Sequence, residues 1–222
     1  MIEKSRLSYL QKGCIMKKTL LNFADLMCSW CWGFSPVMEK IHAKAKDKAE
    51  LQIFVGGLRP FTEHVMTDQD KSYVRNHWDH VAKASGQPFD YALFDREDFT
   101  YDTEPACRAV VTLRRIEPDL APEMLARLHK AFYAENQDTT DTNVLADLAH
   151  EVGVPRGDFQ IAFEDDATKQ ETLADFQYAQ RSQVTGFPTV IGVTEGAQSI
   201  ALTLGFRAWE GVEPTLDDWL SA

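Results

Sequence analysis

Two cysteines separated by two residues, Cys28 and Cys31, form the pair in this chain best suited to chemistry. The apolar run 19–25 predicts a buried strand before them, and helical spacing of apolar residues over 32–48 predicts a helix after them. Cys28 therefore lies at a helix start, where unpaired N–H groups make a thiol more acidic and so more reactive. Cys31 returns to the same face almost one turn later, within reach of a disulfide, so the pair predicts a dithiol redox centre.

The other two cysteines do not extend this pair into a metal site or a disulfide framework. A structural zinc site needs further Cys or His ligands, and the chain has no second C-x-x-C motif and no histidine pair near the first. We therefore expect no metal. Cys107 lies in an apolar helical pattern, which predicts a small buried side chain, with a second redox thiol as the alternative. Cys14 lies in a polar stretch, and we expect that thiol to be incidental.

Composition narrows the classes of partner. The chain of 222 residues carries 34 acidic and 23 basic side chains, a formal charge of −11, which argues against nucleic acid or an anionic membrane as partner. Its apolar runs are far shorter than the roughly 18 residues of a membrane span. Residues 1–18 show no secretory signal pattern. We therefore expect a cytoplasmic protein, and the sequence leaves a homodimer open.

Strand-like and helical segments are segregated along the chain. A second apolar run, 51–58, predicts a strand after the first helix, and two β-rich runs at 189–193 and 199–204 predict a hairpin. A short helix is predicted over 214–220. Between 62 and 184 the apolar period is helical throughout. The order is therefore β-α-β, a helical block, then β-β-α.

This order indicates one interrupted α/β domain, because two independent domains would not leave a pair of strands at each end. We expect residues 16–60 and 185–222 to form the α/β unit and residues 61–184 to form a helical insertion. Residues 1–15 are expected to be a disordered extension or a start-site artefact. Within the insertion, Thr142 is predicted to cap a helix.

A second candidate site segment is Thr-Gly-Phe-Pro-Thr at 185–189, just before the third predicted strand. Proline is tolerated at a strand entrance, so Pro188 can be a simple boundary residue. We favour a cis peptide bond between Phe187 and Pro188, given the C-x-x-C motif and the β-β-α tail. Such a bond would lay the Phe187 backbone beside the dithiol, where its N–H and C=O could pair with an extended peptide.

Together these segments resemble the thioredoxin-fold disulfide oxidoreductases of the DsbA type. The chain is similar to the FrnE-like branch of that type through the segments CSWCWGF at 28–34 and GGLRP at 56–60. The resemblance covers residues 19–222. It implies an α/β thioredoxin fold interrupted by an all-helical insertion.

The resemblance also implies thiol–disulfide exchange with protein or peptide thiols. Cys28 would be the nucleophile that forms a mixed disulfide, and Cys31 would release the substrate by attacking the Cys28 sulfur. Pro188 would hold the substrate-facing loop, with Phe187 beside it. No metal or nucleotide cofactor is implied, and glutathione is a candidate co-substrate.

The two residues between the cysteines, Ser29 and Trp30, indicate how strongly oxidising the Cys28–Cys31 disulfide is. Strongly oxidising DsbA relatives carry Pro-His there, and the histidine stabilises the thiolate. Ser29 offers a hydroxyl group but Trp30 adds no positive charge, so we expect a less oxidising disulfide. We also expect Trp30 to be exposed and in contact with substrate, whereas Trp32 and Phe34 are expected in the core.

Proton transfer to the second thiol, Cys31, depends on the acidic residues that precede the motif. Thioredoxins and DsbA place a buried carboxylate six residues before the first cysteine, and this chain has Asn22 there. Asp25 is nearer, but we expect it to face another direction. Proton transfer to Cys31 then goes through water or is slower. We expect His77 to pack in its helix and the other histidines, His129 included, to be solvated.

Two other functional classes stay open. Kappa-class glutathione transferases and hydroxychromene-carboxylate isomerases resemble this architecture, but they usually carry serine or a lone thiol at the first motif position. The presence of both Cys28 and Cys31 disfavours that reading. A redox-gated binding or chaperone protein is the third possibility, with the dithiol as a switch.

Overall fold

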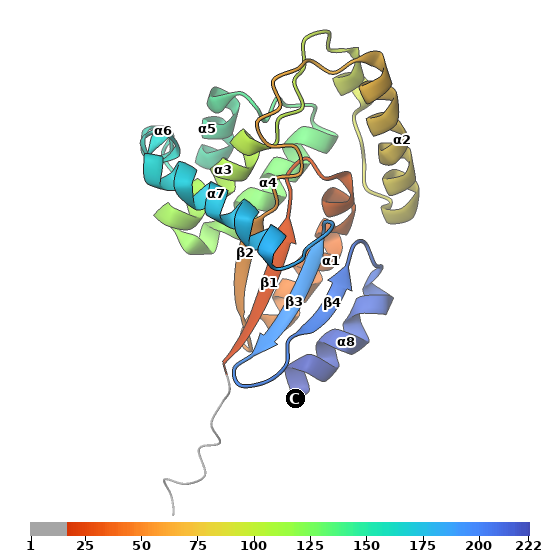
Figure 1. Cartoon of the computed structure of the whole chain (residues 1–222), viewed down its shortest axis with the longest axis vertical. Helices are drawn as coiled ribbons and strands as arrows, with labels where there is room; N and C mark the ends of the chain where they lie inside the picture. Colours follow the sequence, from red (N-terminus) through yellow and green to blue (C-terminus); the bar gives the residue numbers. More distant parts are fainter. Residues whose placement is uncertain (1–16) are drawn as a thin grey trace, which may run out of the picture.

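A four-stranded mixed sheet forms the centre of the molecule, with strand order β2-β1-β3-β4 (Figure 1). The computed structural model describes residues 17–222. Strand β1 pairs parallel with β2 and antiparallel with β3, which pairs antiparallel with β4. The strands are β1 (Lys18–Ala24), β2 (Glu50–Val55), β3 (Thr189–Thr194) and β4 (Ile200–Leu204).

Two helices complete the α/β unit. Helix α1 (Ser29–Ala45) connects β1 to β2, and α8 (Trp209–Ser221) follows β4. Their apolar faces pack on the sheet in one core cluster, in which Leu20 of β1 meets Ile41 of α1 and Leu216 of α8. The β-α-β and β-β-α order expected from the sequence is thus confirmed.

All the secondary-structure elements between β2 and β3 are helices, which confirms the predicted helical block. In Figure 1 these helices gather above the sheet, at the end where β1 and β2 terminate. They are α2 (Asp68–Ser85), η1 (Tyr91–Asp95), α3 (Glu104–Ile116), η2 (Pro118–Leu120), α4 (Ala121–Ala134), α5 (Thr142–Glu151), α6 (Arg156–Glu164) and α7 (Asp166–Arg181).

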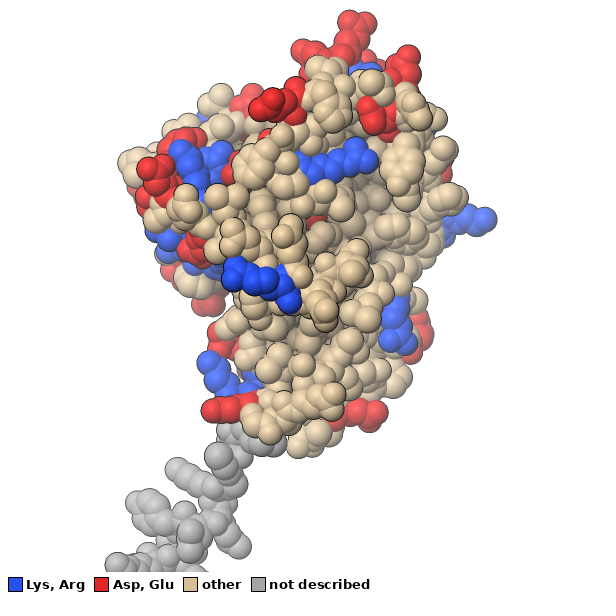
Figure 2. All heavy atoms as spheres, in the orientation of Figure 1, with Lys and Arg blue, Asp and Glu red and all other residues tan. Residues whose placement is uncertain are grey.

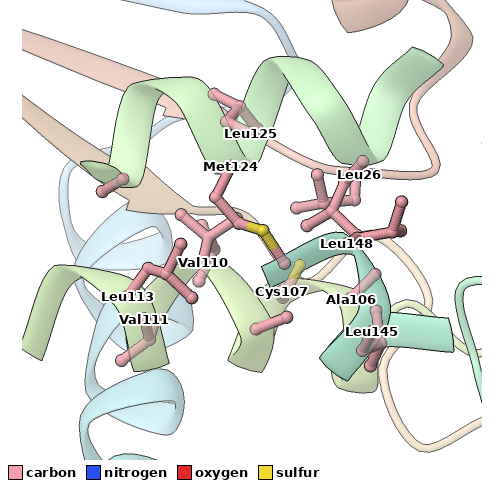
Figure 3. Packing of buried hydrophobic residues seen from close by; sticks show 14 of the residues in the cluster. Leu26, Ala106, Cys107, Val110, Val111, Leu113, Met124, Leu125, Leu145 and Leu148 are labelled. Atoms are coloured by element: carbon pink, nitrogen blue, oxygen red, sulfur yellow. The ribbon is translucent and has the colours of Figure 1, made fainter. Parts of the chain in front are cut away.

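The helical block shares a hydrophobic core with the sheet. One cluster of buried side chains runs from Val55 of β2 and the cysteines Cys28 and Cys31 into α3, α4 and α5. Figure 3 shows its middle, where Cys107 and Val110 of α3 face Met124 of α4. Because burial of apolar area stabilises the folded chain in proportion to that area, this shared core fixes the insertion firmly against the α/β unit.

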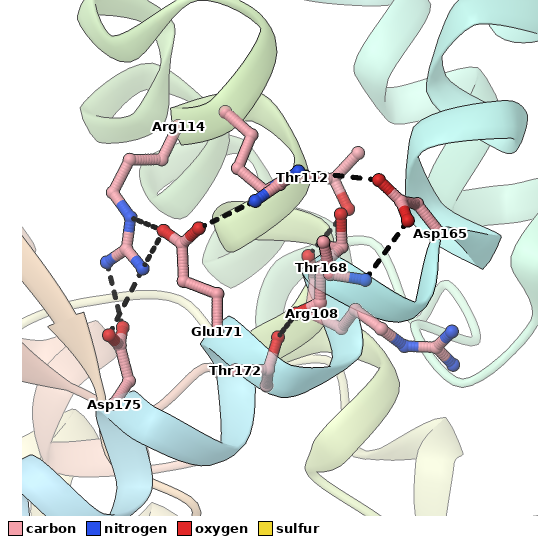
Figure 4. A network of polar contacts seen from close by, with 10 residues as sticks. Arg108, Thr112, Arg114, Asp165, Thr168, Glu171, Thr172 and Asp175 are labelled. Atoms are coloured by element: carbon pink, nitrogen blue, oxygen red, sulfur yellow. Dashed lines mark hydrogen bonds and ion pairs between the residues drawn. The ribbon is translucent and has the colours of Figure 1, made fainter.

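An ionic network closes the exposed edge of β2. Arg114 of α3 donates to the Ile53 carbonyl oxygen (2.6 Å) and to the Asp175 carboxylate of α7 (2.8 Å). Asp175 also accepts the Val55 N–H (3.1 Å). Figure 4 shows Arg114 held between Asp175 and Glu171. Two backbone groups of this edge strand, which could otherwise pair with another chain, are therefore satisfied by side chains of the insertion.

Several predicted boundaries are wrong. The first helix spans Ser29–Ala45 rather than 32–48, and the second strand ends at Val55 rather than at residue 58. Asp141, not Thr142, caps α5, because its carboxylate accepts the Asn143 N–H (2.7 Å). Helix α8 begins at Trp209 rather than at Pro214, since Val212 and Leu216 continue its buried face across the proline.

No helix in residues 17–222 combines the length and hydrophobicity needed to cross a bilayer. The extension expected over 1–15, with Cys14, lies outside the described residues.

Candidate active site

The first helical turn of α1 sets the position of the dithiol. Cys28 is the N-cap residue with extended backbone (φ −87°, ψ 108°), and its carbonyl oxygen accepts the Cys31 N–H (2.9 Å) and the Trp32 N–H (3.2 Å). The Cys28 side chain makes no capping hydrogen bond to this helix end. The sulfur of Cys28 therefore lies at the positive end of the helix dipole, and Ser29 begins the helix as a buried residue.

Both thiols are unpaired and almost enclosed: Cys28 is 8% exposed and Cys31 3%. Burial raises the pKa of Cys31 well above its ordinary value, and the contact with the Cys28 thiol and the charge of Asp25 raise it further. The two sulfurs differ in surroundings, because Cys28 also reaches the loop before β3. Cys31 is therefore a protonated thiol in the reduced protein.

The loop before β3 places a backbone acceptor against Cys28. The Phe187–Pro188 peptide bond is cis. The Cys28 thiol donates to the Phe187 carbonyl oxygen at 3.5 Å. Pro188 is buried, and its own carbonyl oxygen accepts the Gly205 N–H (2.7 Å). These contacts hold both residues beside the dithiol.

The Phe187 ring depends on the first glycine of the GGLRP segment. A Cβ at Gly56 would come within 2.2 Å of the ring, so no side chain fits between strand and ring. The next residue, Gly57, has φ of +64° and is covered by the Phe176 ring. The two glycines thus let aromatic rings from the β3 loop and from α7 lie directly on the backbone that follows β2.

Asp25 lies behind the dithiol, which corrects the expectation that it faces elsewhere. Its carboxylate is fully buried and accepts the Met27 N–H (2.9 Å) and the Leu58 N–H (2.6 Å). Burial raises the pKa of Asp25, and these backbone donors partly offset that rise. The Asx-type bond to Met27 turns the side chain inward, so its charge reaches Cys31.

Two further ionisable side chains lie on the buried side of this carboxylate. The Cys107 thiol donates to Asp25 Oδ2 at 3.6 Å, and burial together with the Asp25 charge raises the pKa of Cys107 well above its ordinary value. Cys107 is thus buried as expected, but in a polar contact. His129 is 2% exposed, and its Nε2 lies 3.2 Å from the Asp25 carbonyl oxygen. The prediction that His129 is solvated is wrong.

A tyrosine pair supports the backbone just before Cys28. The Tyr101 hydroxyl donates to the Met27 carbonyl oxygen (2.6 Å), and the Tyr133 hydroxyl lies close to it. Burial raises the pKa of both hydroxyls. Arg59 of the GGLRP segment stacks on the Tyr101 ring at 5.4 Å. The two tyrosines give no sequence motif, because Tyr133 lies in the apolar pattern of α4 and Tyr101 lies in the segment before α3.

The aromatic residues of the motif divide between core and surface. Trp32 and Phe34 are buried, as expected. Trp30 is half-buried and tilts against Phe206, with ring centroids 5.4 Å apart, rather than standing free in solvent. Phe61 is exposed. Figure 2 shows that the face crossed by the loop between α7 and β3 carries few charged side chains: basic side chains lie across it, and acidic side chains lie mostly around its rim.

Known proteins share this architecture over nearly the whole chain. A proposed protein disulfide isomerase from Nitrosomonas europaea is 35% identical and superposes with a TM-score of 0.85, covering 92% of this chain and 98% of that one. The cytosolic disulfide reductase DsbM from Pseudomonas aeruginosa is 23% identical with a TM-score of 0.71, covering 91% and 95% of the two chains. The second likeness shows the fold alone.

A curated relative is more distant. The ClpXP adapter protein SpxH from Halalkalibacterium halodurans is 19% identical over 179 residues, which is 78% of this chain but 57% of that protein. The chain thus spans little more than half the length of this relative. The family model for DSBA-like thioredoxin domains matches residues 19–211. The chain therefore belongs to the DSBA-like thioredoxin family of disulfide oxidoreductases.

Proposed function

We propose that this protein exchanges disulfides with protein or peptide thiols through Cys28 and Cys31. One observation carries the proposal: the Cys28 sulfur lies at the start of α1, in contact both with the Cys31 thiol and with the Phe187 carbonyl oxygen. A nucleophilic sulfur, a second sulfur to displace the product and a backbone acceptor for substrate thus meet at one point.

In the proposed cycle, the Cys28 thiolate attacks a substrate disulfide and one substrate sulfur leaves. Cys31 then attacks Cys28, which closes the Cys28–Cys31 disulfide and releases the second substrate sulfur as a thiolate. The reverse sequence oxidises a substrate dithiol. The two protein sulfurs carry the electrons, so the proposed reaction needs neither a metal nor a nucleotide cofactor.

Substrate binding is proposed for the loop and the rings around Cys28. Phe187 presents its carbonyl oxygen and Pro188 fixes that loop, while Ser29 and Trp30 line the approach from α1. The sparsely charged face in Figure 2 suits an unfolded or extended peptide, whose apolar side chains it can cover. Glutathione is proposed as a co-substrate, and DsbM has been solved with GSH.

Reduction of insulin and refolding of a scrambled disulfide protein test this function. We expect both activities in the full chain, complete loss in Cys28→Ala, and an accumulating mixed disulfide in Cys31→Ser. Cys14→Ala is the control for a change in thiol count alone. Wild-type activity that survives in Cys28→Ala would contradict the proposal.

The same variants separate the alternative classes. Glutathione conjugation or isomerisation that persists in Cys31→Ser would favour a glutathione-dependent transferase or isomerase. Client binding that follows oxidation, without turnover, would favour a redox-gated chaperone. We propose that the protein acts in the cytoplasm, supported by the cytosolic DsbM neighbour, and trapping of thiols in fractionated cells tests that location.

A further inference from the structure

A cavity of about 310 Å³ reaches Cys31 but not Cys28. It lies between α1, α4 and the strands β1 and β2, and Pro188 closes one part of its wall. Its remaining walls are mostly apolar: Ala24, Phe34, Met38, Leu51, Ile53, Pro122, Leu125 and Ala126. The volume corresponds to roughly ten water molecules at liquid density. The second thiol therefore borders open space within the protein.

Two buried polar side chains, Asn22 and His129, line this cavity. Asn22 is 2% exposed, and its amide group can both donate and accept hydrogen bonds there. His129 must donate from Nε2 to the Asp25 carbonyl oxygen, because a carbonyl can only accept. The Nδ1 lone pair of His129 is then left for a molecule in the cavity. Buried polar groups of this kind normally bind water or a ligand.

The mouth of the cavity is acidic. Glu39 of α1, Asp119 of η2 and Glu123 of α4 line it as exposed side chains, and His42 is half-buried among them. Within the described part of the chain, no lysine or arginine lines the cavity. A positively charged species in the cavity would be stabilised by these carboxylates, whereas an anion would be repelled.

Among residues 17–222, the groups next to the Cys31 thiol are poor acceptors for its proton. The titratable groups facing this thiol are Cys28, Asp25 and His129. Burial lowers the pKa of His129 to about 4, so it is a weak base. The Asp25 carboxylate already accepts two backbone N–H groups, and it does not border the cavity through which a proton could leave.

We propose that this cavity admits a small uncharged external base, an amine or imidazole, which removes the Cys31 proton. The inference rests on the proposed exchange function. The base takes the S–H proton and becomes its conjugate acid. The Cys31 thiolate attacks the Cys28 sulfur, a Cys28–Cys31 bond forms, and the bond from Cys28 to the substrate sulfur breaks. The substrate leaves as a thiolate and takes a proton from solvent.

The negative charge at the mouth of the cavity favours uncharged bases over anionic ones. An uncharged base becomes a cation when it accepts the proton, and the carboxylates of Glu39, Asp119 and Glu123 stabilise that cation. Anionic bases such as phosphate dianion or HEPES lose this advantage and are repelled. HEPES is also larger than imidazole, so the cavity discriminates by size as well.

Ellman's reagent separates the two steps in one experiment. Attack by Cys28 releases one thionitrobenzoate, and attack by Cys31 on the resulting mixed disulfide releases a second. We expect the rate of the second phase, in a Cys14→Ala background, to rise with imidazole concentration at fixed pH and ionic strength. HEPES and phosphate at the same pH should leave it unchanged, and the first phase should not respond to imidazole.

A cavity-filling variant provides the structural control. Ala126→Leu places a larger side chain in the cavity, and we expect it to reduce the imidazole effect at least twofold. Ala162→Leu changes another half-buried helical alanine that does not line the cavity, and it should behave as wild type. If Ala126→Leu does not fold, the comparison of imidazole with HEPES and phosphate in the protein with the unmodified cavity tests the inference instead.

The outcomes separate this inference from the function on which it rests. A second phase that ignores imidazole, or that accelerates equally with HEPES, overturns the cavity as a site for an external base. An imidazole effect that is the same in Ala126→Leu also overturns it. Absence of any phase that depends on Cys31, shown by identical traces for wild type and Cys31→Ser, instead overturns the exchange function.

Discussion

Burial of ionisable side chains behind the dithiol ties the stability of the molecule to pH. His129 is neutral when folded, because burial lowers its pKa from 6.5 to about 4. The unfolded chain binds a proton to this histidine below pH 6.5, and the folded chain does not do so until about pH 4. Acid therefore favours the unfolded state across this window.

The first prediction follows from that linkage. Between pH 6.5 and 4, His129 should remove about 3 kcal/mol from the free energy of unfolding. His129→Gln should lose this contribution, which denaturant unfolding at several pH values measures. His150→Gln changes an exposed histidine and should keep the wild-type slope. An unchanged slope in His129→Gln would show that other groups cause the acid sensitivity.

Asp25 couples the stability of the loop to the chemistry of the second thiol. Asp25→Asn should cost about 1–3 kcal/mol, because the amide can accept only one of the Met27 and Leu58 N–H groups. The same substitution removes a charge that raises the pKa of Cys31, so release of the mixed disulfide at neutral pH should accelerate. Thermal unfolding and the second phase with Ellman's reagent measure these effects. A variant that is less stable but releases substrate more slowly would contradict this role.

At the residue scale, sequence reasoning succeeds for residues in a motif and fails for residues brought together by the fold. The spacing of Cys28 and Cys31 and the proline before β3 carry their own signal. Asp25 and His129 do not, because their roles depend on burial by α3 and α4, which lie about 80 to 100 residues away in the chain. An Asp three residues before the N-cap was the available hint, since such a side chain can bond the following backbone.

At the element scale, the segment after β2 and the loop before β3 act as one unit. Gly56→Ala would push the Phe187 ring out of its place, because the new Cβ would lie 2.2 Å from ring atoms. We expect a loss of about 1–3 kcal/mol in stability and slower exchange with peptide substrates, since the Phe187 carbonyl oxygen moves with the ring. Gly157→Ala is the control, because its Cβ meets nothing within 4 Å. Normal exchange rates in Gly56→Ala would show that the position of the Phe187 carbonyl oxygen does not depend on the position of the Phe187 ring.

The network on the β2 edge is the second test at this scale. Arg114→Ala leaves the buried Asp175 carboxylate without its cation and exposes the Ile53 carbonyl oxygen, so we expect a loss of about 3 kcal/mol or more. Arg115→Ala removes a more exposed arginine that pairs with the same Glu171, and it should cost no more than about 1 kcal/mol. Urea unfolding measures both. Equal losses of stability in the two variants would show that the contacts of Arg114 with β2 and Asp175 stabilise the fold no more than an exposed ion pair does.

Elements themselves follow well from the sequence. Thr67 and Asp70 form a capping box at the start of α2 and Gly86 ends it in the left-handed conformation, so both ends are set by signals that act within a few residues. The early start of α8 does not follow from them, since it depends on a hydrophobic face that continues past Pro214. The contact between Arg114 and β2 also joins residues 61 positions apart. Local signals thus give the elements, and long-range packing decides their partners.

At the scale of the whole molecule, the last prediction concerns the equilibrium between the reduced and the oxidised protein. The helix start and the Phe187 carbonyl oxygen are the groups that contact the Cys28 sulfur, and the intervening Trp30 turns toward Phe206 without adding charge. Cys31 is stable as a thiol because it is buried next to the Asp25 charge. A strong oxidant instead stabilises its reduced form through the thiolate.

We therefore expect the Cys28–Cys31 couple to have a reduction potential near the cytosolic range of about −220 to −320 mV. Equilibration with glutathione or dithiothreitol buffers, followed by alkylation of free thiols, measures it. Trp30→His restores the residue of strongly oxidising relatives and should shift the potential upward by tens of millivolts, because a positive charge beside Cys28 stabilises the thiolate. Trp209→His changes a half-buried tryptophan away from the dithiol and should leave the potential unchanged. A wild-type value near −120 mV would instead make the protein an oxidant, with a thiolate stabilised by groups other than the residues between the cysteines.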